Sequence, residues 1–559
     1  MRKSDIHFLP APGTRAIFLV FSALFMLSAA PAQALGADDQ VPSQVPSDEE
    51  LISRGATIGD ILFRTENIFD IADPREDNRL FRLANRLHLR TRRSTVANQL
   101  LFKTGDPYNR RILDESARIL RSNRYFYDAR IRPVAYRDGR VDIEVVTRDV
   151  WTLRPGFSFE RKGGRNTTSV DFEETNFLGR GSRISFERSS TPERDTNSME
   201  FEDEHLFGTW WRTALLLSES DDGRKRSIRV ERPFYSLDSH WTAGGSHIDD
   251  ERVDTLAARG AIAGPFLTRV KFLRFFGGWS GGLRHGWVRR WTVGATKDET
   301  RFSVAPERTG TTAVPGDRLL TYPWIGFEFL EDRFEEAKNR DQIERTEDFF
   351  LGTRLGATAG YASQSFGSDR DALVFTASLG KGIESDRRWI FTFNAAADGR
   401  VESGTVRNTV AGGASRLYLR LGEKWLFFAL VSGNKAIRPD DDRQLLLGGD
   451  NGLRGYPALY QPGDRRFLLT LEQRFYTPWF PFRLFRLGGA IFFDMGKAWG
   501  GDFRGVPDTG LLRDIGAGLR IGNARSGLGN VIHIDIAFPL DGDPSIARAQ
   551  LLVVTKQSF

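Results

Sequence analysis

The feature that most constrains the fold of this chain is a long region in which apolar residues recur at every second position. The clearest segment, residues 531–540, has the sequence VIHIDIAFPL. Its alternate positions from Ile532 to Phe538 are large and apolar, whereas His533 and Asp535 lie between them. Successive side chains of a β-strand point to opposite faces. The segment therefore predicts a strand with one apolar and one partly polar face, and less regular segments of this kind recur from residue 152 onward.

The length of this region sets the expected size of the fold. Segments of about ten alternating residues, separated by turns, are the sequence signature of membrane-spanning β-barrels. The region from residue 152 to residue 559 holds 408 residues. At about 25 residues for a strand and its connection, it predicts an antiparallel transmembrane β-barrel of about 16 strands. A soluble array such as a propeller is the alternative, but no blade repeat of roughly 40–50 residues is visible.

The N-terminus predicts export from the cytoplasm. Basic Arg2 and Lys3 precede an apolar run at 16–27, and the small-x-small sequence Ala-Gln-Ala ends at Ala34. This pattern predicts a signal peptide over residues 1–34, cleaved after Ala34. An uncleaved anchor helix is the alternative, but the run is shorter than the roughly 20 residues that span a bilayer. Residues 35–56, acidic and containing Pro and Ser, are expected to form a flexible lead-in.

Composition excludes several kinds of chemistry. The chain has no cysteine, so disulfides, thiolate metal sites and cysteine nucleophiles are excluded. Its seven histidines are scattered, the closest being His240 and His247, and none has a metal-ligand spacing. The sequence GWSGG at 278–282 fits the G-x-S-x-G nucleophile elbow of hydrolases through Ser280, but that elbow requires a strand-turn-helix context. We therefore expect no enzyme, no cofactor, no metal and no nucleic-acid partner.

Residues 57–151 have a different pattern, typical of a small α+β domain. An expected strand at 58–71 precedes two expected helices, one beginning at Ser94 and one following a Gly-Asp-Pro turn at 105–107. Two further strands are expected on either side of Asp138-Gly139, a strong hairpin signal. This order resembles a POTRA domain, a periplasmic module that precedes outer-membrane assembly barrels. The resemblance implies a periplasmic domain at 57–151 and a barrel at 152–559.

Motifs in the barrel region carry a more specific resemblance. GLRGY, at residues 452–456, looks like the VRGF/Y motif of the BamA/TamA-type outer-membrane superfamily (bacterial surface antigen family), which includes two-partner secretion translocators. FFDMG, at 492–496, matches the F-x-D-x-G strand motif of that superfamily, and LTLEQRFYTP places Glu472 where its members carry a strand glutamate. NFLGRG at 176–181 and RPFYS at 232–236 resemble its early-barrel patterns. The resemblance marks the loop motif Gly452, Leu453, Arg454, Gly455 and Tyr456, the wall residues Glu472, Phe492, Asp494 and Gly496, and the C-terminal aromatic signal Phe559.

Physical chemistry agrees with what the resemblance implies, namely that this loop folds back into the barrel. An arginine inside a barrel needs partners, because an unpaired charge in a desolvated site is costly. Asp494 and Glu472 can supply carboxylates that a guanidinium engages with bidentate geometry. Glycine beside Arg454 allows close approach to the wall, and Tyr456 offers a surface on which an arginine can stack. A solvated arginine at the tip of the loop is the alternative.

The expected function follows from the resemblance. It implies a protein of the outer membrane of a Gram-negative bacterium that assists the assembly or insertion of other proteins, by strand addition at the POTRA edge and at the barrel seam. Unfolded outer-membrane or secreted client proteins and outer-membrane lipids are the expected partners, with a periplasmic or inner-membrane protein as a further candidate. A two-partner-type translocator that exports a protein through the barrel, and a structural surface-antigen barrel, are the alternatives.

Overall fold

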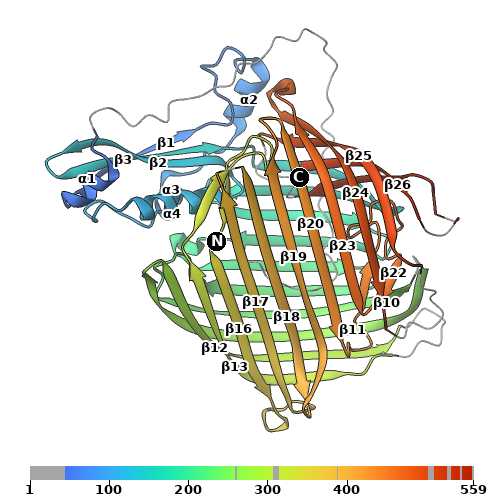
Figure 1. Ribbon diagram of the computed structural model, residues 1–559. Helices are drawn as coiled ribbons and strands as arrows, with labels where there is room; N and C mark the ends of the chain where they lie inside the picture. The colour runs from blue at the N-terminus through green and yellow to red at the C-terminus, as the bar shows by residue number, and fades with distance from the viewer. Residues whose placement is uncertain are drawn as a thin grey trace.

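The computed structural model describes residues 45–258, 261–305, 314–386, 388–501, 509–525, 531–541, 544 and 546–556. The predicted signal peptide with Ala34, most of the expected lead-in and the C-terminal Phe559 lie outside these residues. The described chain forms a small N-terminal module, residues 45–150, at one end of a large β-barrel (Figure 1).

The N-terminal module packs helices against a three-stranded sheet. Its helices are α1 (Asp48–Ser53), α2 (Arg79–Leu87), α3 (Arg93–Ala97) and α4 (Arg110–Arg121), and its strands are β1 (Thr57–Glu66), β2 (Phe126–Arg137) and β3 (Arg140–Asp149). The sheet order is β1-β3-β2, with β1 parallel and β2 antiparallel to the central β3. The predicted hairpin turn at Asp138 and Gly139 is confirmed, since both have positive φ between the paired β2 and β3. Its assignment as a POTRA domain stays a prediction.

Twenty antiparallel strands close the barrel formed by the described residues. The strands are β4 (Leu153–Lys162), β5 (Arg165–Phe177), β6 (Ser182–Ser190), β7 (Asp195–Asp203), β8 (Arg212–Ser220), β9 (Gly223–Arg232), β10 (Trp241–Ala258), β11 (Ala261–Arg284), β12 (Trp287–Val304), β13 (Arg318–Glu331), β16 (Thr353–Ala362), β17 (Ala372–Ser385), β18 (Trp389–Glu402), β19 (Thr405–Arg420), β20 (Trp425–Ile437), β23 (Arg465–Tyr476), β24 (Phe485–Trp499), β25 (Leu512–Asn523), β26 (Val531–Pro539) and β27 (Gln550–Lys556).

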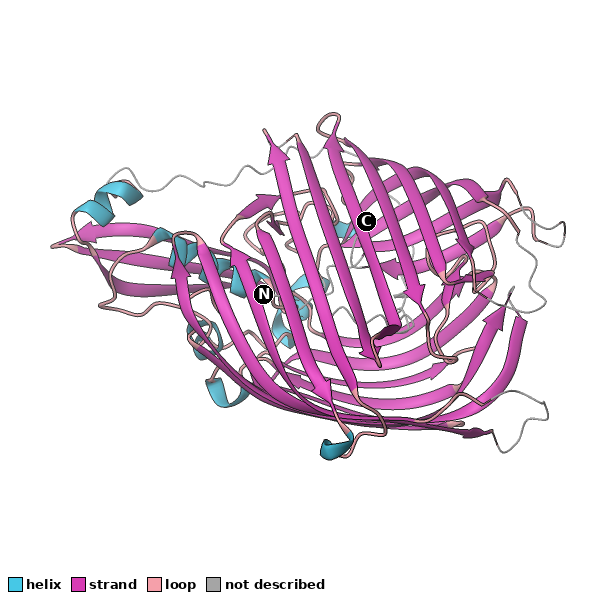
Figure 2. Cartoon of the chain, turned by 60° about the horizontal axis from the view of Figure 1, so that its bottom comes forward, coloured by secondary structure: helices cyan, strands magenta, loops and turns pink. Residues whose placement is uncertain are grey.

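Four short strands and three single 3₁₀ turns lie in the connections: β14 (Phe334–Ala337), β15 (Glu347–Phe350), β21 (Leu445–Leu447), β22 (Gln461–Gly463), η1 (Leu206–Gly208), η2 (Gln364–Phe366) and η3 (Pro481–Arg483). Figure 2 shows the strands curving around the interior of the barrel.

The antiparallel barrel agrees with the prediction, but the predicted number of about 16 strands is wrong. The prediction counted about 25 residues for each strand with its connection, but many connections in the structure are shorter than this count assumes. Two-residue loops join β4 to β5, β8 to β9 and β18 to β19. Tight loops of this kind leave more of the chain for strands, and the same region therefore makes twenty of them.

Alternation along the strands separates the two faces of the wall. In β26, Ile536 and Phe538 are about half exposed (48% and 46%), whereas His533 and Asp535 are buried. This is the arrangement that the sequence of 531–540 predicts, with large apolar side chains outside and polar ones inside. Among the described residues, no helix is both long enough and apolar enough to cross a bilayer.

The N-terminal module sits against the turns at one end of the barrel, called here the module end; the opposite end is the far end. The NFLGRG motif, at the turn between β5 and β6, forms hydrogen bonds with the module. Arg92 donates its backbone N–H to the carbonyl of Gly179, Thr95 donates its hydroxyl to the same carbonyl, and Asn176 donates its amide to Thr91. The motif therefore holds the module against the barrel.

Candidate functional site

A long connection between β20 and β23 folds back into the barrel from the far end. This segment, residues 438–464, is called here the inner loop, and it carries the GLRGY motif beside the short β21–β22 pair. Leu453, Arg454 and Tyr456 are all buried. In the strand order the inner loop is the eighth connection at the far end, and five strands follow it.

Arg454 binds two carboxylates on the barrel wall. Its Nε and Nη2 donate to Asp494 at 2.6 and 2.9 Å, and its Nη1 donates to Glu472 at 2.7 Å. Asp494 lies on β24 and Glu472 on the neighbouring β23. A third carboxylate, that of Asp535 on β26, lies 3.6 Å from Nη1. This cluster, called here the latch, brings together the loop residue and both wall carboxylates that the sequence analysis singled out. Its role in holding the loop stays a prediction.

The aromatic ring against Arg454 comes from the wall, and it is not the one expected. The guanidinium carbon lies 3.4 Å from the centre of the Phe492 ring, in cation–π geometry. The Tyr456 hydroxyl instead donates toward the carbonyls of Arg513 and Asp541, at 2.8 and 3.0 Å. Phe492 precedes Asp494 by two residues and so shares its inward face. Tyr456 therefore ties the loop tip to β25 and to the connection after β26.

Two glycines of the motifs are required by close approach. A Cβ at Gly455 would lie 2.6 Å from the Cβ of Asp514 and 3.0 Å from the backbone nitrogen of Pro539. A Cβ at Gly496 would lie 2.7 Å from the carbonyl oxygen of Phe467. These approaches are closer than a Cβ tolerates, so glycine is required at Gly455, where the loop meets β25, and at Gly496, where β24 lies against β23.

Two further residues, which the sequence analysis missed, donate hydrogen bonds to the carboxylates of the latch. Arg474 donates to Glu472 at 2.9 Å, and Thr470 donates to Asp494 at 2.8 Å. Both lie on β23 at two-residue steps from Glu472 and therefore face the interior with it. That periodicity is the signal that could have identified them. Each wall carboxylate thus has a second donor besides Arg454.

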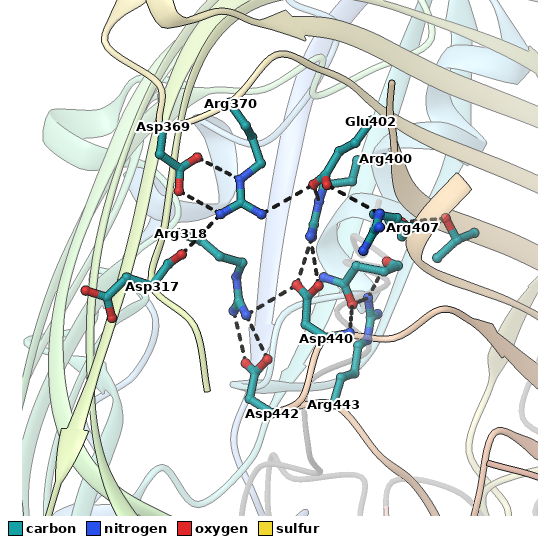
Figure 3. A network of polar contacts seen from close by, with 12 residues as sticks. Asp317, Arg318, Asp369, Arg370, Arg400, Glu402, Arg407, Asp440, Asp442 and Arg443 are labelled. Carbon is teal, nitrogen blue, oxygen red and sulfur yellow. Dashed lines mark hydrogen bonds and ion pairs between the residues drawn. The ribbon is translucent and has the colours of Figure 1, made fainter. Parts of the chain in front are cut away.

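The base of the inner loop is held separately, by a group of ion pairs on another part of the wall (Figure 3). Asp440 accepts two hydrogen bonds from Arg400 of β18, both 2.8 Å long. Asp442 accepts two from Arg318 of β13, at 2.7 and 3.0 Å. Arg443 donates to Asp398 at 3.0 Å. The inner loop therefore forms ion pairs with the wall at two places, through its base near β13 and β18 and through its tip near β23 and β24.

A second segment fills the interior from the module end. The β14–β15 hairpin connects β13 to β16, and its tip reaches across to the wall on the other side. The carbonyl of Arg340 accepts hydrogen bonds from Arg474 and Tyr476 of β23, at 2.8 and 3.3 Å. Asp341 accepts one from Tyr418 of β19 at 3.0 Å. Because Arg474 also binds Glu472, the hairpin and the latch share one wall residue.

The N-terminal module binds the same β14–β15 hairpin. Arg121 of α4 donates to Asp348 at 2.6 and 2.9 Å and to Glu336 at 2.6 Å. Inside the hairpin, Glu347 accepts backbone N–H groups of Arg340 and Asp341, both at 2.9 Å. Burial, with the neighbouring carboxyl of Asp341 as a second cause, raises the pKa of Glu347 to about 8. The hairpin thus joins the module to the barrel interior.

The barrel closes through a weak pair of strands. Among the described residues, the last strand, β27, pairs with β26 through seven residues and with the first strand, β4, through Val553 and Arg161 only. β4 itself pairs with β5 through ten. The junction of β27 with β4, called here the seam, therefore has a much shorter ladder within the described residues than the neighbouring strand pairs have.

Other candidate chemistry is placed as follows. Ser280 lies within β11, where its hydroxyl accepts the backbone N–H of Gly282, and no helix follows. This is not the strand-turn-helix context of a nucleophile elbow. In the part of the chain that the structure describes, no group of three or more acidic or histidine residues could hold a metal ion.

Comparisons with known proteins give no sequence match. No family model matches the chain, and no curated protein does. Solved structures with a similar fold include BamA from Haemophilus ducreyi lacking POTRA domains 1–3, at 12% identity, covering 89% of this chain and 84% of that one with a TM-score of 0.38. CdiB from Acinetobacter baumannii is 11% identical, covering 90% and 74% with a TM-score of 0.42. CdiB from Escherichia coli is 13% identical, covering 89% and 77% with a TM-score of 0.43. BamA is among the proteins that the sequence motifs resemble, and the likeness concerns the fold.

Proposed function

We propose that this chain is an outer-membrane β-barrel of the BamA/TamA type that assists the assembly or insertion of other outer-membrane proteins. The outward apolar face of strands such as β26 supports a membrane position. The observation that carries the function is the seam, where β27 and β4 share a single residue pair within the part of the chain that the structure describes. Unpaired strand edges are templates for pairing with another chain. A client strand can therefore add to β4 or β27 without first breaking a full ladder.

The N-terminal module supplies a second place for strand addition. Strands β1 and β2 lie at the two edges of its sheet, because the central β3 is the one described strand with which each of them pairs. An extended client segment can extend such an edge through main-chain hydrogen bonds, which demand little of its sequence. Contacts of Thr91 and Thr95, beside and in α3, with the NFLGRG motif hold the module that carries these edges against the barrel.

The latch has a structural role in this proposal. Arg454 fastens the inner loop to β23 and β24. Tyr456 adds a contact with β25, and Asp535 adds one with β26, the strand that pairs with β27. The wall on that side of the seam is thereby braced from within. Movement at the seam can then occur at β27 and β4 while β23–β26 keep their shape.

Export of a partner protein through the barrel is the second candidate function. A translocated chain needs an open interior, whereas the inner loop and the β14–β15 hairpin both cross it and are both fastened by ion pairs. Export would require that both segments leave together. Assembly at the seam requires neither to leave, which is why the geometry favours it over export. A structural barrel without transport activity has no use for a weak seam.

A disulfide across the seam tests the proposal. Because the chain has no native cysteine, only the introduced pair can form a disulfide within it. The variant carries Arg161→Cys with Val553→Cys, the one pair of partners at the seam. Its control carries Thr358→Cys with Thr376→Cys, partners within the complete β16–β17 ladder. In vesicles, we expect oxidation of the seam variant to abolish its acceleration of barrel-protein insertion, with recovery on reduction, and no effect on the control. Equal activity of the oxidised and reduced seam variant would contradict the mechanism.

A further inference from the structure

Helix α2 presents an exposed apolar ridge beside a basic one. Leu80, Leu83 and Leu87 recur at helical spacing and are 75%, 48% and 64% exposed. Arg79, Arg82 and Arg86 recur at the same spacing on the neighbouring stripe and are also exposed. A soluble helix packs its leucines inward, and burying one contributes about 1.5–3 kcal/mol. Three exposed leucines in one row therefore indicate a surface that something apolar covers.

Other residues of α2 form the face that packs against the module, so the leucine ridge is not the packing face of this helix. Phe81 stacks on Phe69 with ring centres 3.8 Å apart. Asn85 exchanges hydrogen bonds with both backbone groups of Phe69, at 2.8 and 3.1 Å. His88, just after the helix, binds Asp149 of β3 at 2.9 Å. These contacts fix the rotation of the helix, and with it the direction of the leucines.

The same contacts place α2 at the rim of the barrel. Arg525, which follows β25, donates to the carbonyl of Ile68 at 2.8 Å and to that of Arg483 at 3.0 Å, and it pairs with Glu76. Its guanidinium lies between the rings of Phe69 and Phe480, 5.0 and 5.7 Å from their centres. In Figure 1, α2 accordingly lies beside the module-end tips of the red and orange strands.

The rim next to α2 has the character of a membrane interface. Trp479 and Phe482, in the β23–β24 turn on either side of Phe480, are 64% and 65% exposed. Exposed aromatic rings at the ends of barrel strands are typical of the level of the lipid headgroups. The leucine ridge of α2 thus continues an apolar belt that begins on the barrel itself.

The charge of the segment matches an anionic surface. Residues 78–93 contain six arginines and no acidic residue. Arg82 binds Asp77, whereas Arg79 and Arg86 have no ionic partner within the described residues. Each basic side chain near an anionic bilayer contributes about 1 kcal/mol of attraction. Leucines toward acyl chains and arginines toward phosphates are the arrangement of a helix that lies in the plane of an interface.

We propose that α2 lies in the module-side leaflet of the bilayer that holds the barrel, with its leucine ridge among the acyl chains and its arginines on anionic phospholipid headgroups. The inference rests on the proposed placement of the barrel in an outer membrane. It adds a membrane contact for the N-terminal module, which holds that module at the lipid surface on the side of the barrel formed by β23–β25.

Single cysteines test this placement, since the full chain has none of its own. Leu83→Cys reports on α2, and Ile536→Cys, on the outer face of β26, reports whether the barrel is in the bilayer. Ile52→Cys on α1, 54% exposed and part of the same module, is the matched control. Each variant is folded into vesicles of phosphatidylethanolamine and phosphatidylglycerol, labelled with a fluorophore, and exposed to lipids that carry a nitroxide quencher near the headgroup.

We expect the label at Leu83 to be quenched within about twofold of the label at Ile536 and at least about fivefold more than the label at Ile52. Quenching at Ile536 but not at Leu83 would overturn the proposal and leave the barrel in the membrane. Quenching at neither would overturn both placements. If the Leu83 label is not quenched by the lipid and its fluorescence changes only when an unfolded barrel protein is added, the ridge binds protein clients instead.

The arginines have a separate test in the same vesicles. Replacing phosphatidylglycerol with phosphatidylcholine is expected to reduce quenching at Leu83 by about half or more, and to leave quenching at Ile536 unchanged. The double variant Arg79→Gln with Arg86→Gln should remove this dependence on lipid charge. Quenching at Leu83 that does not change with lipid charge would overturn the role of the arginines.

Discussion

Replacing Arg454 with alanine should release the tip of the inner loop. The side chain makes three charged hydrogen bonds, two to Asp494 and one to Glu472, and stacks on Phe492. After its removal, Glu472 keeps the guanidinium of Arg474, whereas Asp494 keeps the neutral hydroxyl of Thr470 and lies beside the buried carboxyl of Asp514, its partner on β25. The uncompensated charge is therefore concentrated on Asp494.

The free-energy cost of the substitution follows from this unpaired charge. Breaking a buried ion pair by removing one partner costs about 3–5 kcal/mol. At 1.4 kcal/mol for each factor of ten, the population of released loop should rise by between about a hundredfold and a few thousandfold. Cleavage of residues 438–464 by a protease added outside folded barrels measures this population, since cleavage follows the open fraction when the loop opens and closes quickly. Urea unfolding, followed by the mobility shift of the folded barrel on gels, measures the effect on the barrel.

Arg465→Ala is the matched control, because Arg465 directly follows the same loop as the first residue of β23, with a side chain that is 48% exposed and 3.7 Å from its nearest carboxylate. We expect it to cost less than about 1 kcal/mol. Adding Asp494→Asn to Arg454→Ala should recover part of the loss, because it removes the charge left unpaired. If Arg454→Ala and Arg465→Ala are cleaved at the same rate, the latch does not hold the loop.

Three other outcomes are expected. Asp440→Asn should increase cleavage near the base of the inner loop while the barrel stays folded, since Arg400 would lose a bidentate charged partner; cleavage equal to that of the unaltered chain would contradict the second fastening. Ile515→Lys, on the outer face of β25, should destabilise the barrel in vesicles by up to about 4 kcal/mol, as measured in urea, and an unchanged midpoint would place this face outside the lipid. The raised pKa of Glu347 means that the hairpin gains stability at acidic pH, which is fully present below the ordinary value of 4.5 and is lost as the pH rises through about 8. Protease sensitivity of the hairpin should therefore rise over that range, and Glu347→Gln should remove the dependence; a flat profile in the unaltered chain would refute it.

Local patterns allowed much of the wall to be predicted. Because side chains on a strand alternate, the sequence of 531–540 alone indicates which residues face outward, and Ile536 and Phe538 do so. The motifs that resemble the BamA/TamA-type superfamily marked Glu472 and Asp494 as partners for Arg454, and they are its hydrogen-bond acceptors. Helix α2 was missed although its leucines recur at helical spacing, because that signal covers only nine residues.

The sequence by itself therefore determined the barrel architecture, the two faces of its strands and the residues of the latch, since each is written in a short-range period or motif. Only the tertiary structure decided the count of twenty strands, which depends on how tightly each hairpin turns. It also decided which aromatic ring lies against Arg454, and the pairing of Asp442 with Arg318, 124 residues away. Contacts across a closed barrel join positions that share no local pattern, so closure of the wall creates them.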